Sequence, residues 1–124
     1  MKDYSAMSDF DINLAIAHLV LGKGNYDWNA EKKEVYRAGM DGGEFLPNAY
    51  FNPCENPSDA WLIIFRERIT LTPKVTGYEW DAISPVILND DIEHLHTDKN
   101  PLRAAMIVFL MMKDRESSHA KTSV

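Results

Sequence analysis

The stretch Asn52–Trp61, NPCENPSDAW, contains two Asn-Pro pairs, the only cysteine of the chain and a tryptophan. Its second half is typical of a helix start. Asn56 can cap the helix, Pro57 occupies the first helical position, where a missing N–H costs nothing, and Asp59 complements the positive end of the helix dipole. The first Asn-Pro pair favours an extended or turn conformation at Asn52, which leads the chain into the cap. We therefore predict a helix that begins at this stretch, with Trp61, Ile64, Phe65 and Arg68 on one face.

The same Asn-Pro signature recurs in NPLRAAMIVFLMMKD, residues 100–114. Asn100 is the predicted N-cap and Pro101 opens a second proline-started helix. This helix is apolar almost all round from Ala104 to Met112, so it must be covered on two sides or lie at a subunit contact. The nine apolar residues are too few to span a bilayer, which needs roughly 20.

A further helix is predicted before these two, over about Asp9–Leu21. Ser8 and Asp11 are placed to accept hydrogen bonds from unpaired backbone N–H groups at its start, and Gly22 supplies a left-handed stop. Its expected apolar stripe is the set Phe10, Leu14, Ala17, His18 and Leu21.

The remaining segments favour short strands. Residues 23–53 predict two strands, one of them at EVYRA (residues 34–38), and DGGEF (residues 41–45) is typical of a turn. A hairpin is expected from Ile69–Thr72 and about Tyr78–Ile83, followed by an acidic loop over residues 85–99. The chain is thus predicted to be one α+β domain, residues 1–124, in which a small antiparallel sheet is layered with about three helices. The ordered core is expected over residues 7–114, with a mobile polar tail over residues 115–124.

Composition limits the function classes. The net charge of −6 disfavours general nucleic-acid binding, which needs a basic face. One cysteine cannot form an internal disulfide, and the acidic start MKDYSAMSDFD lacks the apolar core of a secretory signal. We expect a cytoplasmic protein without membrane contact.

No motif predicts catalysis. Cys54 lies shortly before a helix N-terminus, which can activate a thiol, but no histidine is placed beside it, so a structural thiol is favoured over a nucleophile. His94 and His96 are spaced to share a face in an extended segment and could bind a metal, but no third ligand is marked, so a solvated acidic loop is favoured. We expect a protein that is not an enzyme and has no cofactor or metal.

The sequence also contains a candidate anion site. Arg103 is predicted in the first turn of its helix, where a cation opposes the dipole, and a helix N-terminus beside an arginine can bind phosphate or carboxylate. The expected ligand-binding residues are the two helix starts, this arginine and two aromatic platforms: Asn56, Ser58, Trp61, Trp80, Asn100 and Arg103. The alternative, which is favoured over a ligand site, is that Arg103 pairs with a nearby acid and that the tryptophans belong to the core.

Three motifs together resemble one known family. MSDFDIN (residues 7–13), FNPCENPSDAWLIIFRERITLTP (residues 51–73) and NPLRAAMIVFLMMKD (residues 100–114) resemble the NinX family of lambdoid phages, a domain of unknown function. The second and third motifs are also similar to the phage ABA sandwich domain, which has a sheet between helical layers. The resemblance implies a phage origin and no assigned enzyme activity, and it carries over no site residues.

Two functions follow as hypotheses. In the first, the protein is a counter-defence sponge, likewise expected to be a homo-oligomer, that sequesters a small anionic, nucleotide-derived immune signal of the host. In the second, it is an acidic interaction module that docks on a basic host or phage DNA-transaction protein.

Overall fold

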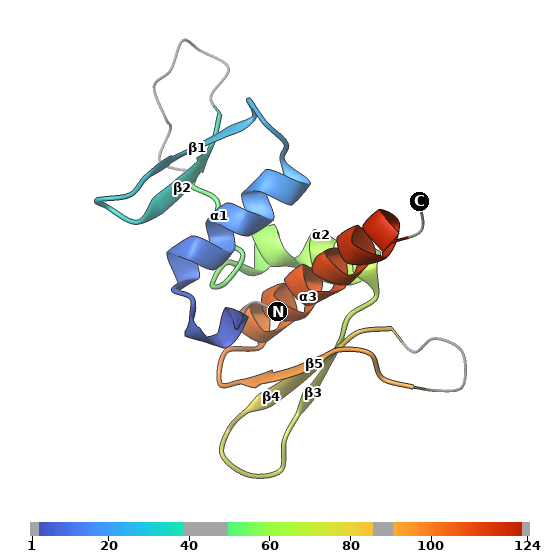
Figure 1. The fold of residues 1–124 in the computed structure, drawn as a ribbon. Helices are drawn as coiled ribbons and strands as arrows, with labels where there is room; N and C mark the ends of the chain where they lie inside the picture. The colour runs from blue at the N-terminus through green and yellow to red at the C-terminus, as the bar shows by residue number, and fades with distance from the viewer. Residues whose placement is uncertain (1–2, 39–49, 86–90, 123–124) are drawn as a thin grey trace.

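In the part of the chain that the structure describes, three α-helices and two small antiparallel sheets form the fold, which confirms the predicted α+β class (Figure 1). The computed structural model describes residues 3–38, 50–85 and 91–122, and side chains up to Glu116. The elements in chain order are a 3-10 turn (Tyr4–Ala6), α1 (Asp9–Val20), β1 (Tyr26–Asn29), β2 (Glu34–Arg37), α2 (Pro57–Glu67), β3 (Thr70–Pro73), β4 (Trp80–Ile83), β5 (Leu95–Asp98) and α3 (Pro101–Thr122).

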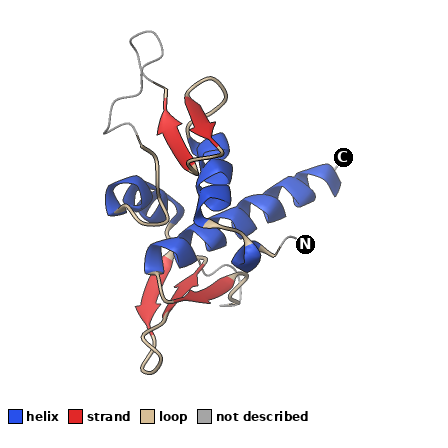
Figure 2. Ribbon diagram, turned by 90° about the vertical axis from the view of Figure 1, so that its left-hand side faces the viewer, coloured by secondary structure: helices blue, strands red, loops and turns tan. Residues whose placement is uncertain are grey.

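The helix α3 lies at the centre of the molecule. Its residues from Ala104 to Leu110 are all buried, because β3–β5 pack on one side and α1 and α2 on the other. The prediction that this helix is covered on two sides is confirmed. Figure 2 shows the helices between the two sheets, whereas the resemblance to the ABA sandwich domain implied a sheet between helical layers.

The two predicted helix starts that involve α1 and α2 are confirmed. The Ser8 side chain accepts from the backbone N–H of Asp11, and the Asn56 side chain accepts from that of Ser58. Gly22, with φ of +87°, follows the last turn of α1 as the left-handed stop.

The sheets follow the two predicted early strands and the one predicted hairpin, with one addition. β1 pairs with β2, and β3 with β4, each antiparallel. The segment predicted as an acidic loop over residues 85–99 contains β5, which pairs with β4 and places Leu71, Ala82 and His96 in one row across the sheet. That part of the loop prediction was wrong, because the LHTD sequence of β5 has too short an alternation to be recognised alone. The predicted turn at residues 41–45 lies outside the described residues.

Two predicted helix faces need correction. In α1 the buried residues are Ile12, Asn13, Ile16 and Ala17, while His18 is exposed. In α2, Ile63 and Ile64 are buried together with Ala60, but Trp61 and Phe65 point into solvent. The cause in both helices is that apolar residues occupy more than one stripe, so spacing alone did not select the stripe that packs. The polar tail predicted after residue 114 is largely helical, since α3 continues to Thr122.

Candidate functional site

Asn100 fixes the start of α3 and connects it to the segment before α2. Its side-chain oxygen accepts from the backbone N–H groups of Leu102 and Arg103, at 2.9 and 3.2 Å. Its side-chain nitrogen donates to the carbonyl of Cys54 at 2.7 Å. The two Asn-Pro segments therefore lie side by side, as the anion-site hypothesis required, but the Asn100 amide already occupies the N–H groups that an anion would need.

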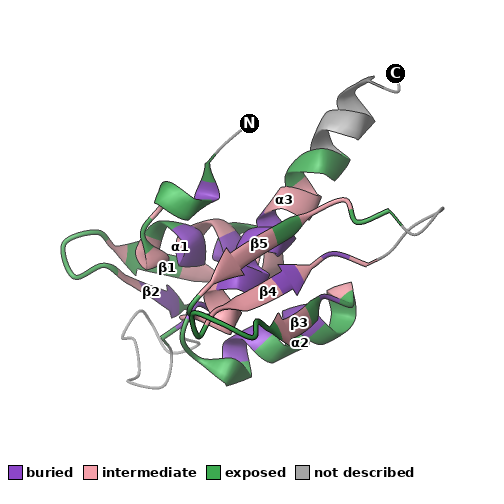
Figure 3. Ribbon diagram, turned by 90° about the horizontal axis from the view of Figure 1, so that it is seen from below, coloured by how far each residue is buried: buried purple, intermediate pink, exposed green. Residues whose placement is uncertain are grey.

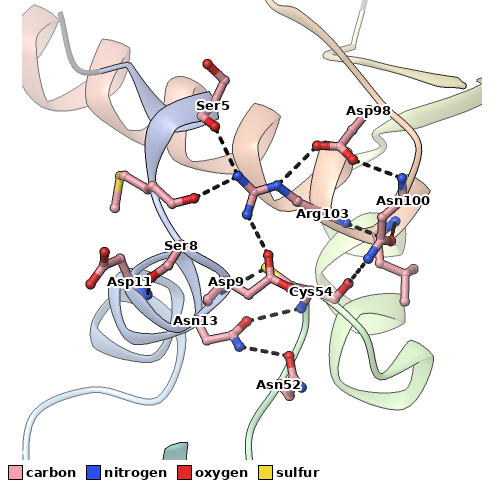
Figure 4. A network of polar contacts seen from close by, with 12 residues as sticks. Ser5, Ser8, Asp9, Asp11, Asn13, Asn52, Cys54, Asp98, Asn100 and Arg103 are labelled. Carbon is pink, nitrogen blue, oxygen red and sulfur yellow. Dashed lines mark hydrogen bonds and ion pairs between the residues drawn. The ribbon is translucent and has the colours of Figure 1, made fainter. Parts of the chain in front are cut away.

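The guanidinium of Arg103 is enclosed by acceptors from the same chain (Figure 4). Its Nε donates to Asp98 at 3.1 Å and its Nη1 to Asp9 at 2.5 Å. Its Nη2 donates to the carbonyls of Ser5 and Met7, at 3.2 and 2.7 Å. The side chain is only 15% exposed, and all three nitrogens are engaged. An incoming anion would have to displace two carboxylates, so the alternative interpretation, in which Arg103 pairs with nearby acids, describes the structure.

A second set of polar contacts continues this network toward α1. Asn13, which is buried, donates to the side chain of Asn52 at 2.8 Å and accepts from the backbone N–H of Cys54 at 3.1 Å. The network thus connects the N-terminal segment, α1, the Asn-Pro loop, β5 and α3. Buried polar groups satisfied in this way favour one arrangement of the packed elements over others.

The Cys54 thiol is fully buried beside this network. Burial, and next the Asp9 carboxylate, raise the pKa of the thiol to about 12. A thiol with so high a pKa is protonated near neutral pH and is a poor nucleophile. The geometry agrees with the structural thiol favoured from the sequence.

The six predicted ligand residues do not converge on one hollow. The Asn56 side chain accepts from the backbone N–H of Ser58 at 3.0 Å, which closes the α2 terminus in the same way as Asn100 closes α3. Trp80 is half-buried in β4 and opposite Asp98 in the ladder, whereas Trp61 is 60% exposed on α2.

Two cavities among the described residues lie away from the predicted site. One of about 130 Å³ lies between α1, β2 and the segment before α2, and one of about 180 Å³ lies beside His94 and the later turns of α3. Neither is lined by any of the six predicted residues. Both are smaller than the roughly 300 Å³ at which pockets for small organic ligands begin.

The metal alternative at His94 and His96 is also without support in the described part of the chain, which contains no group of three or more potential ligands. The His94 Nε2 lies 3.1 Å from the carboxylate of Glu93, which also pairs with Arg115. Burial lowers the pKa of His96, whose ring shares a face of the sheet with Ala82.

Among the described residues, no helix is long and apolar enough to cross a membrane.

The surface of α2 is the feature that sequence reasoning missed. Trp61, Leu62 and Phe65 are 60%, 67% and 69% exposed, and the rings of Trp61 and Phe65 lie 6.3 Å apart. Figure 3 shows α2 at the edge of the molecule with exposed residues along it. We call these three side chains the α2 face. The sequence did indicate this face. The α2 helix has apolar residues on two opposite sides, whereas packing against a core requires apolar residues on one side only.

Comparison with known proteins identifies a family. The sequence model of the family described as "Bacteriophage P22, NinX" matches residues 3–113. No curated protein and no solved structure matches the chain.

Proposed function

We propose that this chain, which belongs to the bacteriophage P22 NinX family, is a non-enzymatic accessory protein that acts by binding protein in the cytoplasm of the infected bacterium. The α2 face is the proposed contact surface. Exposure of three adjacent large apolar side chains on this face is the observation that carries the proposal.

The apolar side chains of the α2 face are contiguous. Single exposed apolar residues are normal in soluble proteins, but a contiguous apolar patch with a polar rim is typical of a protein-binding surface. Trp61 and Phe65 are four residues apart and Leu62 lies three residues before Phe65, so the three side chains are neighbours on the helix. Aromatic residues are enriched in the energetically dominant part of interfaces. While this face stays in water its apolar area contributes nothing to the stability of the isolated chain, and a partner that covers it gains the free energy of burying that area.

Sequestration of a small anionic ligand is a weaker proposal. It relied on Arg103 and on the N–H groups of the two helix starts, but each asparagine cap accepts from its own helix start, and Arg103 binds two carboxylates and the N-terminal segment. A nucleotide-derived signal would therefore need a different set of residues.

The net charge of −6 suggested a basic partner protein, but the exposed charges of the described residues do not favour one. Among the described residues with exposed side chains, acids do not outnumber bases. Much of the acidic excess lies at half-buried positions such as Asp98 and Glu93, where it pairs with Arg103 and Arg115. The surface therefore gives no particular preference for a basic DNA-transaction protein, and the proposal rests on apolar contact.

The test is site-specific photo-crosslinking in infected cells. A photoreactive amino acid at Leu62 should give covalent adducts with protein, and the same group at Glu31, which is exposed on the β1–β2 turn, should not. Adding Trp61→Ser and Phe65→Ser should remove the Leu62 adducts. Equal labelling from both positions, or none from Leu62, would refute the α2 face as a contact surface.

A further inference from the structure

The charges that border the α2 face are arranged with opposite signs at its two ends. Glu55 is exposed two residues before the first residue of α2. Arg66 and Arg68 are exposed at the other end, in the last turn and at the C-cap. Arg66 has only a distant partner in Glu67, at 3.7 Å, with the arginine side chain 58% exposed. The face is therefore an apolar strip with one acidic end and one basic end.

Such a strip is complementary to its own copy turned end for end. With a two-fold axis that passes between Trp61 and Leu62, Trp61 of each copy faces Leu62 of the other copy. The same axis pairs Ser58 with Phe65, and Glu55 with Arg68. Two-fold interfaces bury the same patch on both subunits, so this self-complementarity is the property that a symmetric dimer requires. The antiparallel arrangement also places the negative end of each helix dipole beside the positive end of the other.

The area involved suits an interface of modest size. Covering the exposed parts of two aromatic side chains and a leucine would bury on the order of 400 Å² per subunit. This is about half of the roughly 800 Å² per partner in a standard interface, and the polar rim of the helix supplies more. A basic protein would place its charges against Arg66 and Arg68, and an acidic one would meet Glu55. A second copy presents each end of the strip with the opposite charge.

We infer that the α2 face binds a second copy of this chain, and that the two α2 helices pack antiparallel about a two-fold axis with Glu55 of each subunit beside Arg68 of the other. This inference rests on the proposed function, because it names the partner of the same surface. An oligomer was expected because α3 is apolar almost all round, but those apolar residues are buried within the subunit. The α2 face is now the reason to expect an oligomer.

Light scattering coupled to gel filtration tests the stoichiometry with the full chain. The wild type should have the mass of a dimer at high micromolar concentration, and Leu62→Glu should have that of a monomer. Leu62 is 67% exposed, so the substitution should leave the circular dichroism spectrum unchanged. A monomeric wild type, or a dimer that Leu62→Glu leaves intact, would overturn the inference.

A charge exchange tests the antiparallel register. Glu55→Arg and Arg68→Glu should each weaken the dimer about tenfold, because each creates two like-charge contacts across the axis. The double variant restores opposite charges and should return the dissociation constant close to that of the wild type. Glu31→Arg with Lys99→Glu, which exchanges exposed charges away from α2, is the matched control and should have no effect. A double variant as weak as the single ones would overturn the arrangement.

The failure of this inference can be distinguished from failure of the proposed function. If the purified chain is monomeric while Leu62 crosslinks to a different protein in cells, the self-association is wrong and the contact surface stands. If Leu62 gives no protein adduct in cells, the proposed function fails as well.

Discussion

Arg103 has the sequence features of a ligand-binding residue, but in the structure it stabilises the fold. A cation in the first turn of a helix is unfavourable with respect to the dipole, which suggested an external anion. In the structure the compensation comes from Asp9, Asp98 and two backbone carbonyls of the N-terminal segment. The sequence could not distinguish these partners, because Asp9 is 94 residues away along the chain.

Replacing this arginine should therefore affect stability first. Arg103→Ala leaves the Asp9 and Asp98 carboxylates without their cation, and we expect it to lower the free energy of unfolding by about 3 kcal/mol. Arg66→Ala removes an exposed arginine with a 3.7 Å partner and should change stability by less than about 0.5 kcal/mol. Urea denaturation followed by circular dichroism measures both. Equal stability of Arg103→Ala and the wild type would show that the network is not structural.

Cys54 gives a prediction with a defined pH dependence. The raised pKa of about 12 means that the native thiol stays protonated while the unfolded thiol, near 9, ionises first. The stabilisation is therefore fully present below about pH 9 and is lost as the pH rises toward 12. The stability of Cys54→Ala should fall less steeply than that of the wild type across this range, as urea denaturation at several pH values would measure.

Chemical modification checks the same thiol independently. Native protein at pH 8 should resist iodoacetamide and become alkylated only in denaturant, as mass spectrometry would show. Rapid native alkylation would contradict the burial of Cys54.

At the level of elements, the sequence predicted correctly those features that depend on neighbouring residues. The Asn-Pro helix starts, the Ser8 cap and the left-handed Gly22 depend on neighbouring residues, and all appear in the structure. The strand β5 depends on pairing with β4, and the choice of buried face in α2 depends on the position of α3. Those features come from contacts between distant segments, which one sequence does not show.

The two asparagine caps allow a matched comparison. Asn56 makes one capping contact through its side chain, whereas Asn100 caps α3 and also donates to the carbonyl of Cys54. Asn56→Ala should cost about 1 kcal/mol, which is typical for an N-cap. Asn100→Ala should cost about 1 kcal/mol more, because it also leaves a partly buried carbonyl without its donor. Thermal or urea unfolding of the two variants gives the difference, and equal losses would argue against a role for the Cys54 contact.

For the whole molecule, association and ligand binding predict different behaviour. If the native state is a dimer, the melting temperature should rise with protein concentration, since mass action stabilises the associated form. Leu62→Glu should melt independently of concentration.

Ligand sequestration predicts instead that a nucleotide raises the melting temperature, and we expect no such effect. Cyclic nucleotides and ADP-ribose derivatives should give no thermal shift in the wild type, and denatured protein from infected cells should release no nucleotide detectable by mass spectrometry. A released nucleotide would restore sequestration as the leading function.

The contacts of the N-terminal segment with α3 have a consequence for synthesis. Tyr4 bonds to Asp114, and Ser5, Met7 and Asp9 all bind Arg103. The ribosome releases those early residues long before the last helix, so while the middle of the chain is being made α1 has only its contacts with β1, β2 and the segment before α2. Contacts of such long range form late and slow the folding of small domains. The N-terminal segment therefore lacks its partners until α3 emerges, and in a chain stalled before Arg103 we expect proteases to cut that segment.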